Sequence, residues 1–379
     1  MKILHVVNIS FVIPFFLGKQ LNYFSEKGNE EHIICSYSDE LLKFSHQYNF
    51  KYKAFEIERK ISISNDIKAV FKTIKYIKDN DINIVTGHTP KGGFIAMLAS
   101  FFARVPIRIY FRHGLVYETS HGLKRSLLKN IDRLASLLAT RIVCVSPSVF
   151  KRSIADKLNS EKKQIILSKG TCNGIDVERF NQNSIDKIQI YKLKKQYQIA
   201  DEDFVIGFTG RLVRDKGIIE LVEAFWKLKK EHPNIKLLLV GMLEKRDALP
   251  SDFVEKIKKD ASIIKTGYID YSVIELYYSI MDIFVLPSYR EGFPTSVLEA
   301  SSMQIPVITT KVTGCIDSII DKETGFFVKH EINELADKIH LLFNSNKMRM
   351  DMGKKGRDFV VNNFRQEIIW KEIEKLYIK

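Results

Sequence analysis

The clearest chemical feature of this sequence is a strand-to-helix turn suited to an anion. Residues 282–300 read DIFVLPSYREGFPTSVLEA; the apolar run Ile283–Leu286 predicts a buried strand, and Thr295 or Ser296 is placed to start a helix. Backbone N–H groups in the first turn of a helix have no intrahelical partner and attract phosphate, and Gly292 in the loop would let a phosphate come close. The turn therefore predicts an anion site.

Two glutamates flank this turn. Glu291 lies in the loop, and Glu299 lies one turn into the helix with its side chain slanting back toward the helix start, so both carboxylates can border one pocket. A carboxylate beside a phosphate site is a good acceptor for paired sugar hydroxyls. The pair suggests a nucleotide-sugar site; a helix start with an exposed glutamate and a solvated loop is the competing interpretation.

Two cations lie in a second loop of the same kind. Residues 207–217, GFTGRLVRDKG, join a predicted strand to a predicted helix and contain Arg211 and Lys216. The glycine spacing does not fit a dinucleotide motif, but cations in a strand-to-helix loop can neutralise a diphosphate. A surface turn with solvated cations is the alternative.

The first half of the chain offers further candidates. Thr89 and Lys91, in GHTPKGG at the start of an apolar helix, form a second possible anion site, although tight helix packing would explain the glycines equally well. His113 follows a strand predicted at 107–111, and ligands of parallel sheets bind at strand ends. Gly18 lies in the first loop, where the backbone could approach a ligand.

The elements that position these residues alternate between short strands and helices. Strands are predicted at 3–7, 33–35, 53–57, 82–86, 107–111, 142–145, 204–209, 237–240, 263–266, 283–286 and 307–309. The alternation indicates an α/β protein with two doubly wound, Rossmann-like domains. Because the pattern pauses in the polar stretch 181–203, we place one domain at 1–185, a second at 186–355, and a helical segment at 356–379 that packs back on the first.

Composition bounds the class of protein. The 379 residues are 45% apolar, and no apolar run reaches the roughly 18 to 20 residues that span a bilayer. The N-terminus reads as a strand instead of a signal peptide, and four scattered cysteines favour a reducing compartment, so a cytoplasmic location is expected. Residues 1–170 carry 27 Lys and Arg against 14 Asp and Glu. This surplus points to a polyanion or an anionic membrane as partner.

Several of these motifs together resemble retaining glycosyltransferases of family 4. They are the segment 207–217, REGFPTSVLEA at 290–300, and VITTKVTGCIDSI followed by Thr324 and Gly325. NGID at 173–176 resembles the segment near the linker of that family, and GHTPKGG and RHGLVYE are similar to members that build bacterial capsule, O-antigen and other lipid-linked glycans. The resemblance implies a GT-B fold, in which two Rossmann-like domains face a cleft and the second binds most of the donor.

The resemblance also implies roles for the donor-side residues. Glu299 would accept hydrogen bonds from the ribose hydroxyls, and Glu291 would face the hexose. Arg211 and Lys216 would hold the diphosphate leaving group. The loop residues around it would be Gly292, Phe293, Pro294 and Thr295.

In the first domain, the resemblance implies that His113 contacts the sugar and acts with Glu291, Arg211 and Lys216 in catalysis. Gly18 matches the first loop of the family, although the usual glycine pair is absent. Thr89 and Lys91 are assigned to the acceptor.

The expected reaction is transfer of a hexose, N-acetylated and deoxy forms included, from a UDP-sugar to a polyprenyl-diphosphate-linked saccharide in bacterial surface polysaccharide synthesis. Cations and helix amides stabilise the charge that grows on the diphosphate, so no metal ion or other cofactor is expected, and the Asp-x-Asp patterns at 79–81 and 201–203 are interpreted as surface acids. The alternatives are a UDP-sugar epimerase of the same architecture and a nucleic-acid-binding protein, suggested by the pI of 9.3. The latter leaves the second-domain motifs unexplained, so no nucleic acid partner is expected.

A predicted amphipathic helix at 122–140 bears on location. Its basic face holds Lys124, Arg125, Lys129 and Arg133, and its apolar face holds Leu123, Leu127, Ile131, Leu134 and Leu138. We expect the apolar face to lie in the core and the basic face to bind the inner face of an anionic membrane, as in a peripheral membrane protein.

Overall fold

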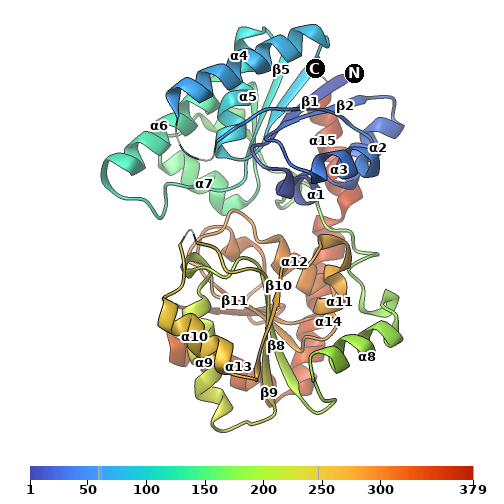
Figure 1. The fold of residues 1–379 in the computed structure, drawn as a ribbon, viewed down its shortest axis with the longest axis vertical. Helices are drawn as coiled ribbons and strands as arrows, with labels where there is room; N and C mark the ends of the chain where they lie inside the picture. The colour runs from blue at the N-terminus through green and yellow to red at the C-terminus, as the bar shows by residue number, and fades with distance from the viewer. Residues whose placement is uncertain (59, 61, 246, 379) are drawn as a thin grey trace. The chain divides into compact units, whose positions relative to one another are not determined.

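The structure is a computed structural model that describes residues 1–58, 60, 62–245 and 247–378. It divides into two compact units, Met1–Gly174 with Gln366–Lys379, and Ile175–Arg365 (Figure 1). Each unit is built on a parallel sheet with helices packed against it, which confirms the predicted Rossmann-like α/β class. Within the described ranges, no helix has both the length and the apolar character needed to cross a bilayer.

The first unit has a seven-stranded sheet in the order β3-β2-β1-β4-β5-β6-β7. Its strands are β1 Lys2–Val6, β2 Glu30–Cys35, β3 Lys51–Ala54, β4 Ile84–Gly87, β5 Ile107–Arg112, β6 Arg141–Cys144 and β7 Gln164–Ile165. Its helices are α1 Ile13–Phe16, α2 Lys19–Glu26, α3 Glu40–Tyr48, α4 Ile63–Asp79, α5 Pro90–Phe102, α6 Gly122–Leu138, α7 Pro147–Ala155 and α15 Gln366–Tyr377.

The second unit has a six-stranded sheet in the order β10-β9-β8-β11-β12-β13. Its strands are β8 Phe204–Thr209, β9 Ile235–Val240, β10 Ile263–Gly267, β11 Ile283–Leu286, β12 Val307–Thr310 and β13 Gly325–Val328. Its helices are α8 Lys187–Gln196, α9 Ile218–Lys229, α10 Ser251–Lys259, α11 Ile274–Tyr278, α12 Thr295–Ser302, α13 Ile332–Phe343 and α14 Asn346–Phe364.

The chain enters the second unit earlier than the polar stretch 181–203, where the sequence placed the boundary. The N–H of Ile175 donates to the carbonyl oxygen of Phe364 at 2.7 Å, and the side chains of Val177 and Phe180 are buried in the core of the second unit. The polar stretch itself contains α8 and lies inside this unit. Apolar residues just after Gly174 therefore determine where the chain changes unit.

Helix α15 belongs to the first unit although it follows the whole of the second. The indole N–H of Trp370 donates to the backbone and side-chain oxygens of Asn173 at 3.0 and 2.9 Å. Ile369 and Ile373 are fully buried, and Lys27 pairs with Glu374 at 2.7 Å.

The prediction for the faces of α6 was wrong for much of the helix, although Leu138 is buried and Lys124 is exposed as predicted. The structure leaves Leu123 91% and Leu127 48% exposed, whereas the Nζ of Lys129 pairs with Asp156 at 2.9 Å. Arg133 donates to the backbone oxygens of Asp156 and Lys157 at 3.2 and 3.1 Å. The turn after α7 supplies these acceptors, so the two cations pack inward and much of the apolar face remains in solvent.

Candidate functional site

Three loops meet at the carboxyl edge of the second sheet, after the neighbouring strands β8, β11 and β12. Gly217, with φ of 70°, lies so close to the second loop that a Cβ atom would be 2.1 Å from the carbonyl oxygen of Pro287. Gly314, with φ of 83°, would place a Cβ atom 2.5 Å from the carbonyl oxygen of Gly292. Both positions require glycine, because any side chain would separate the loops.

Lys216 and Glu291 form an ion pair across the first two loops. Their side chains are 17% and 13% exposed, so water screens the pair only in part. Arg211 pairs instead with Glu244 at 3.2 Å, with its side chain 46% exposed. The structure thus pairs two of the four predicted catalytic residues, Lys216 and Glu291, and pairs Arg211 with a different glutamate.

Glu299 is only 4% exposed, and both of its oxygens accept hydrogen bonds. The hydroxyl of Tyr271 donates to Oε1 at 2.9 Å, and that of Tyr278 donates to Oε2 at 2.8 Å. Burial raises the pKa of Glu299, and the tyrosine hydrogen bonds oppose this. The carboxylate therefore already binds a pair of hydroxyls, which is the chemistry predicted for it, but those hydroxyls belong to the protein.

Helix α12 begins at Thr295, as predicted. Its N-cap residue is Pro294, which has no side-chain oxygen, and no side chain caps the helix. The ring of Phe293 packs against that of Phe364 with centroids 5.4 Å apart, which holds the loop that leads into the helix. The N-cap side chain therefore takes none of the first-turn amides, a condition that favours anion binding at a helix start.

A chain of hydrogen-bonded side chains crosses the first unit and ends at His113. Glu31 Oε2 lies 2.8 Å from His5 Nε2, and His5 Nδ1 lies 2.7 Å from the hydroxyl of Thr86. That hydroxyl lies 3.0 Å from His88 Nε2, and His88 Nδ1 lies 3.0 Å from His113 Nε2. Strands β2, β1 and β4 lie side by side in the sheet, so Glu31, His5 and Thr86, one from each strand, can bond in sequence across it.

The carboxylate fixes the direction of this chain when the imidazoles are neutral. Glu31 only accepts, so His5 carries its proton on Nε2 and accepts from Thr86 at Nδ1. The oxygen of Thr86 then accepts from His88 Nε2, and His88 Nδ1 accepts from the Nε2–H of His113. The Nδ1 of His113 is thereby left as a hydrogen-bond acceptor.

Burial keeps the end of the chain neutral. It lowers the pKa of His113 to about 3, and it lowers the pKa of His88 well below its usual value, with His113 and His5 contributing. A neutral His113 with a free lone pair suits acceptance of a hydrogen bond from a hydroxyl group, and it does not suit donation of a proton.

Helix α1 and the turn before α2 cover His113. The ring of Phe16 stacks on the imidazole of His113 with centroids 3.7 Å apart. Gly18 starts α2 with φ of 46°, and a Cβ atom there would lie 2.6 Å from the carbonyl oxygen of Pro14. Gly18 therefore permits the tight turn, and its contact with a ligand stays a prediction.

The two predicted acceptor residues have protein partners. The hydroxyl of Thr89 caps α5 by accepting from the amide of Gly92 at 3.2 Å. Lys91 forms an ion pair with Asp66 of α4, and their side chains are 12% and 13% exposed. A Cβ atom on Gly92 would lie 2.8 Å from the carbonyl oxygen of Val6, so this glycine permits close packing of α5 on the sheet. The roles of Thr89 and Lys91 toward an acceptor stay predictions.

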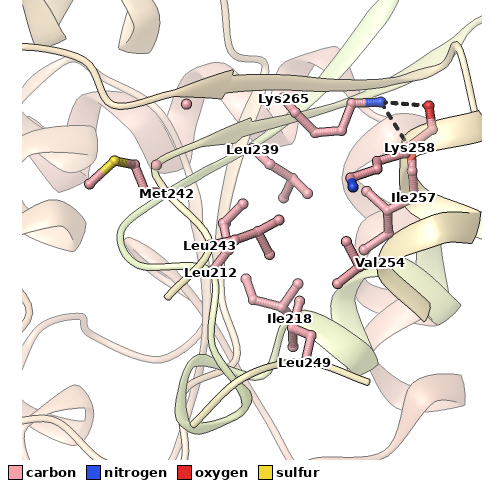
Figure 2. Close-up of a pocket in the computed structure, with 12 residues that line it drawn as sticks. Leu212, Ile218, Leu239, Met242, Leu243, Leu249, Val254, Ile257, Lys258 and Lys265 are labelled. Atoms are coloured by element: carbon pink, nitrogen blue, oxygen red, sulfur yellow. Dashed lines mark hydrogen bonds between the residues drawn. The ribbon is translucent and has the colours of Figure 1, made fainter. Parts of the chain in front are cut away.

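The second unit also contains an apolar pocket of about 410 Å³ (Figure 2). Two lysines line it, and one of them, Lys265, donates to the carbonyl oxygens of Ile257 and Lys258 at 3.0 and 3.4 Å and so caps the end of α10. The predicted site residues do not line this pocket, whose walls are Leu212, Ile218, Leu239, Gly241, Met242, Leu243, Leu249, Val254, Ile257, Lys258, Lys265 and Gly267.

Sequence reasoning missed the side chains that hold the predicted ones in place. Tyr271 and Tyr278 carry no signal, because tyrosines at partly apolar positions are common and nothing in the sequence links these two to Glu299. His5 and Thr86 do carry one, since each is a polar residue inside an otherwise apolar strand. A polar group in a strand buried on both faces needs a partner, and the structure supplies it.

Two family models match the chain. The model described as "Glycosyl transferases group 1" matches residues 189–359, and that described as "Glycosyl transferase 4-like" matches residues 2–146.

Relatives and solved structures match over the full length. The capsular polysaccharide biosynthesis glycosyltransferase CapM of Staphylococcus aureus is 34% identical over 99% of this chain and 96% of its own. The UDP-Gal:alpha-D-GlcNAc-diphosphoundecaprenol alpha-1,3-galactosyltransferase of Escherichia coli is 26% identical over 100% and 96%. The crystal structure of Anabaena Alr3699/HepE in complex with UDP-glucose has a TM-score of 0.82 at 18% identity, over 99% of this chain and 98% of that one.

Proposed function

Since the chain belongs to the group 1 glycosyl transferases and has the GT-B fold, we propose that it is a retaining hexosyltransferase of bacterial surface polysaccharide synthesis. The donor would be a UDP-sugar and the acceptor a polyprenyl-diphosphate-linked saccharide, the substrate classes in the name of the Escherichia coli relative. The observation that carries the proposal is the ion pair of Lys216 and Glu291 beside the uncapped start of α12.

The donor-side chemistry follows from this pair. A diphosphate competes with Glu291 for Lys216, and the cation then stabilises the negative charge that grows as the glycosidic bond breaks. Glu291, released from Lys216, becomes free to accept a hydrogen bond from the hexose. Arg211 would exchange Glu244 for the diphosphate in the same way, and Glu299 would bind the ribose. We propose that transfer needs no metal ion, because these cations and the amides of α12 supply the required positive charge.

The first unit supplies the remaining proposed contacts. The Nδ1 atom of His113 would accept a hydrogen bond from a hydroxyl of the transferred sugar. Gly18 would contact the donor through its backbone, and Thr89 and Lys91 would contact the acceptor. Their present bonds to Gly92 and Asp66 would then have to be exchanged or extended.

Binding and turnover experiments test the proposal in sequence. Thermal unfolding of the full chain with a panel of nucleotide-sugars should show stabilisation by a UDP-sugar and none by dinucleotides. The stabilising donor, incubated with a lipid-linked saccharide, should then give a glycosylated product in the presence of EDTA. Conversion of the donor without any acceptor would identify an epimerase instead, and a metal requirement would contradict the proposed charge stabilisation.

We also propose that the protein acts in the cytoplasm as a peripheral protein of the inner membrane face, attached through the exposed apolar residues of α6. Leu123 and Leu137 are 91% and 70% exposed, and Phe102 on the neighbouring helix α5 is 61% exposed. Insertion of such side chains into the interface, near the basic surplus of residues 1–170, suits an anionic bilayer.

Liposome sedimentation tests the attachment. The double variant Leu123→Ser/Leu137→Ser should lose most of the pelleting with anionic vesicles. Leu42→Ser on α3, at a position 56% exposed in the same unit, is the matched control and should pellet like the parent chain. Equal pelleting of the double variant would reject α6 as the attachment surface and leave the transferase proposal intact.

A further inference from the structure

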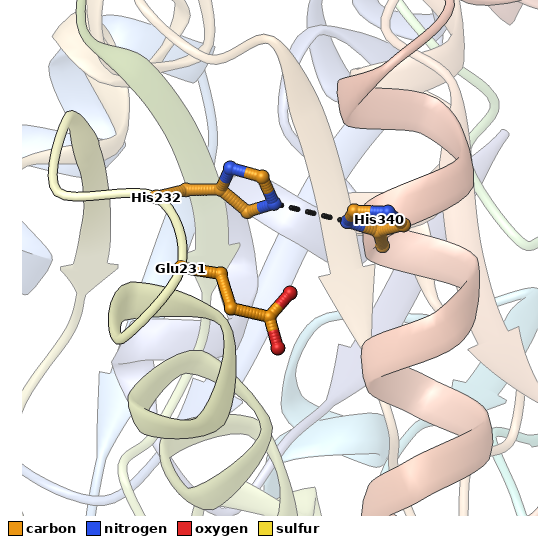
Figure 3. Close-up of side chains that lie close together, drawn as sticks. All are labelled: Glu231, His232 and His340. Carbon is orange, nitrogen blue, oxygen red and sulfur yellow. Dashed lines mark hydrogen bonds between the residues drawn. The ribbon is translucent and has the colours of Figure 1, made fainter.

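We infer that the second unit has a zinc site formed by Glu231, His232 and His340 (Figure 3). Their ligand atoms all lie within 4.8 Å of one another. Glu231 and His232 lie in the turn after α9, and His340 lies in the last turn of α13. Two separate elements therefore bring three potential ligands together.

The separation of the imidazoles matches that of two ligands on one ion. His232 Nε2 and His340 Nδ1 are 3.1 Å apart. Two nitrogens at about 2.0–2.1 Å from a tetrahedral Zn²⁺ are about 3.4 Å apart, so only a few tenths of an ångström of adjustment is needed. The ring of His232 also packs on Phe343 with centroids 4.3 Å apart, which fixes its orientation.

The neighbouring side chains permit the required tautomer. Metal binding needs a lone pair on His340 Nδ1 and hence a proton on Nε2. The amide Nδ2 of Asn344 lies 2.9 Å from that Nε2, and a half-turn of the amide group puts its oxygen there instead, where it accepts the proton. An acceptor behind a ligating histidine is the usual arrangement in zinc sites.

The carboxylate completes the donor set. Glu231 is exposed, and within the described part of the chain its carboxylate takes part in no hydrogen bond or ion pair. Two imidazoles and one carboxylate are a donor set that proteins use for Zn²⁺, with water in the fourth position. Mg²⁺ prefers oxygen ligands and should not compete.

The position of the site in the sheet indicates a structural role. Helix α9 joins the parallel strands β8 and β9, so the turn after α9 lies at the amino edge of the sheet. The loops that carry Lys216 and Glu291 lie at the opposite, carboxyl edge. A zinc ion would tie α9 to α13 without taking part in glycosyl transfer, and the inference does not depend on the proposed function.

Calorimetry with ZnCl₂ on the full, tag-free chain tests the inference. We expect one Zn²⁺ per chain, a thermal midpoint that rises by several degrees at a Zn²⁺ concentration about a hundredfold above Kd, and no response to MgCl₂. Substitution of Co²⁺ should give the absorption of a tetrahedral site, which surface binding to a single histidine would not produce.

Two variants and one control make the test specific. Glu231→Gln alters an exposed side chain and should weaken Zn²⁺ binding at least tenfold, and His340→Gln should abolish it. Glu323→Gln, also an exposed position in the second unit, should bind like the parent chain. Absence of Zn²⁺ binding at 1:1 stoichiometry, or unchanged affinity in Glu231→Gln and His340→Gln, would overturn the inference. Transfer activity well below the thermal midpoint should be equal in parent and Glu231→Gln.

Discussion

Replacement of Thr86 by valine tests whether the buried chain of side chains sets the state of His113. Valine has the shape of threonine without its hydroxyl, and Thr86 is fully buried. The change removes the contacts to His5 Nδ1 at 2.7 Å and to His88 Nε2 at 3.0 Å. Each of the two buried groups left without a partner costs about 1–3 kcal/mol, so stability should fall by ~2–6 kcal/mol.

The same loss should reverse the preferred tautomers beyond the break. An N–H at His88 Nε2 would face the methyl group of valine, so the proton should move to Nδ1 and donate to His113. The Nδ1 atom of His113 would then carry a proton in place of its lone pair. A preference of about 1.4 kcal/mol for the protonated Nδ1 of His113 corresponds to a factor of ten in the population of the two tautomers. We therefore expect kcat to fall about tenfold, with a smaller effect on the KM for the donor.

Thr73→Val is the matched control. Thr73 is also fully buried in the first unit, but its hydroxyl donates only to the carbonyl oxygen of Ala69, one turn earlier in α4, at 2.8 Å. This variant should lose about 1 kcal/mol or less of stability and keep its kcat. Steady-state rates, measured where both variants are folded, decide the matter. Equal kcat values for the two variants would refute the role assigned to the chain.

Three further outcomes are expected. Lys216→Ala should lower kcat by about a hundredfold or more and change donor binding less, because the cation acts on charge that develops in the transition state. Rates of the parent chain with and without EDTA should agree, and a metal requirement would contradict stabilisation of the diphosphate by protein cations alone. Glu299→Gln should weaken UDP binding by ~1.5–3 kcal/mol in calorimetry, whereas unchanged affinity would exclude a ribose contact. The free energy of unfolding should fall as pH drops from 6.5 toward 3, by at most about 1.4 kcal/mol per pH unit for each of His113 and His88. In this range the histidines of the unfolded chain take up protons, whereas folded His113, with its pKa lowered to about 3, and folded His88 do not. Denaturant titrations at pH 7 and 5 measure the difference, and equal stabilities would contradict it.

The pattern of apolar runs was sufficient to predict the α/β class, because buried parallel strands are continuous hydrophobic segments. The pattern did not predict strands β7 and β13, for two different reasons. Gln164–Ile165 is too short to show any period, and Gly325–Val328 begins at a glycine, a residue type that is uncommon in strands. Strand prediction thus fails where length or a turn residue hides the pattern.

Helix α6 shows a different limit. The helical repeat of apolar residues correctly separates its basic from its apolar face, but it does not indicate which face packs against the rest of the unit. That choice depends on acceptors in the turn after α7. Asp156 pairs with Lys129, and the carbonyl oxygen of Lys157 accepts a hydrogen bond from Arg133. The chain from Glu31 to His113 has the same character, since its members come from β1, β2 and the ends of β4 and β5, and only Thr86 and His88 are close in sequence.

The place of α15 has a consequence for how the protein is made. The first unit needs Trp370, whose indole N–H bonds to Asn173, and Ile369 and Ile373, which are fully buried. On the ribosome these residues emerge only after all of Ile175–Arg365, so the second unit has its complete sequence while the first still lacks a helix. The unit that starts first is therefore finished last, and a nascent chain that stops short of α15 leaves its apolar docking surface open to chaperones or to aggregation.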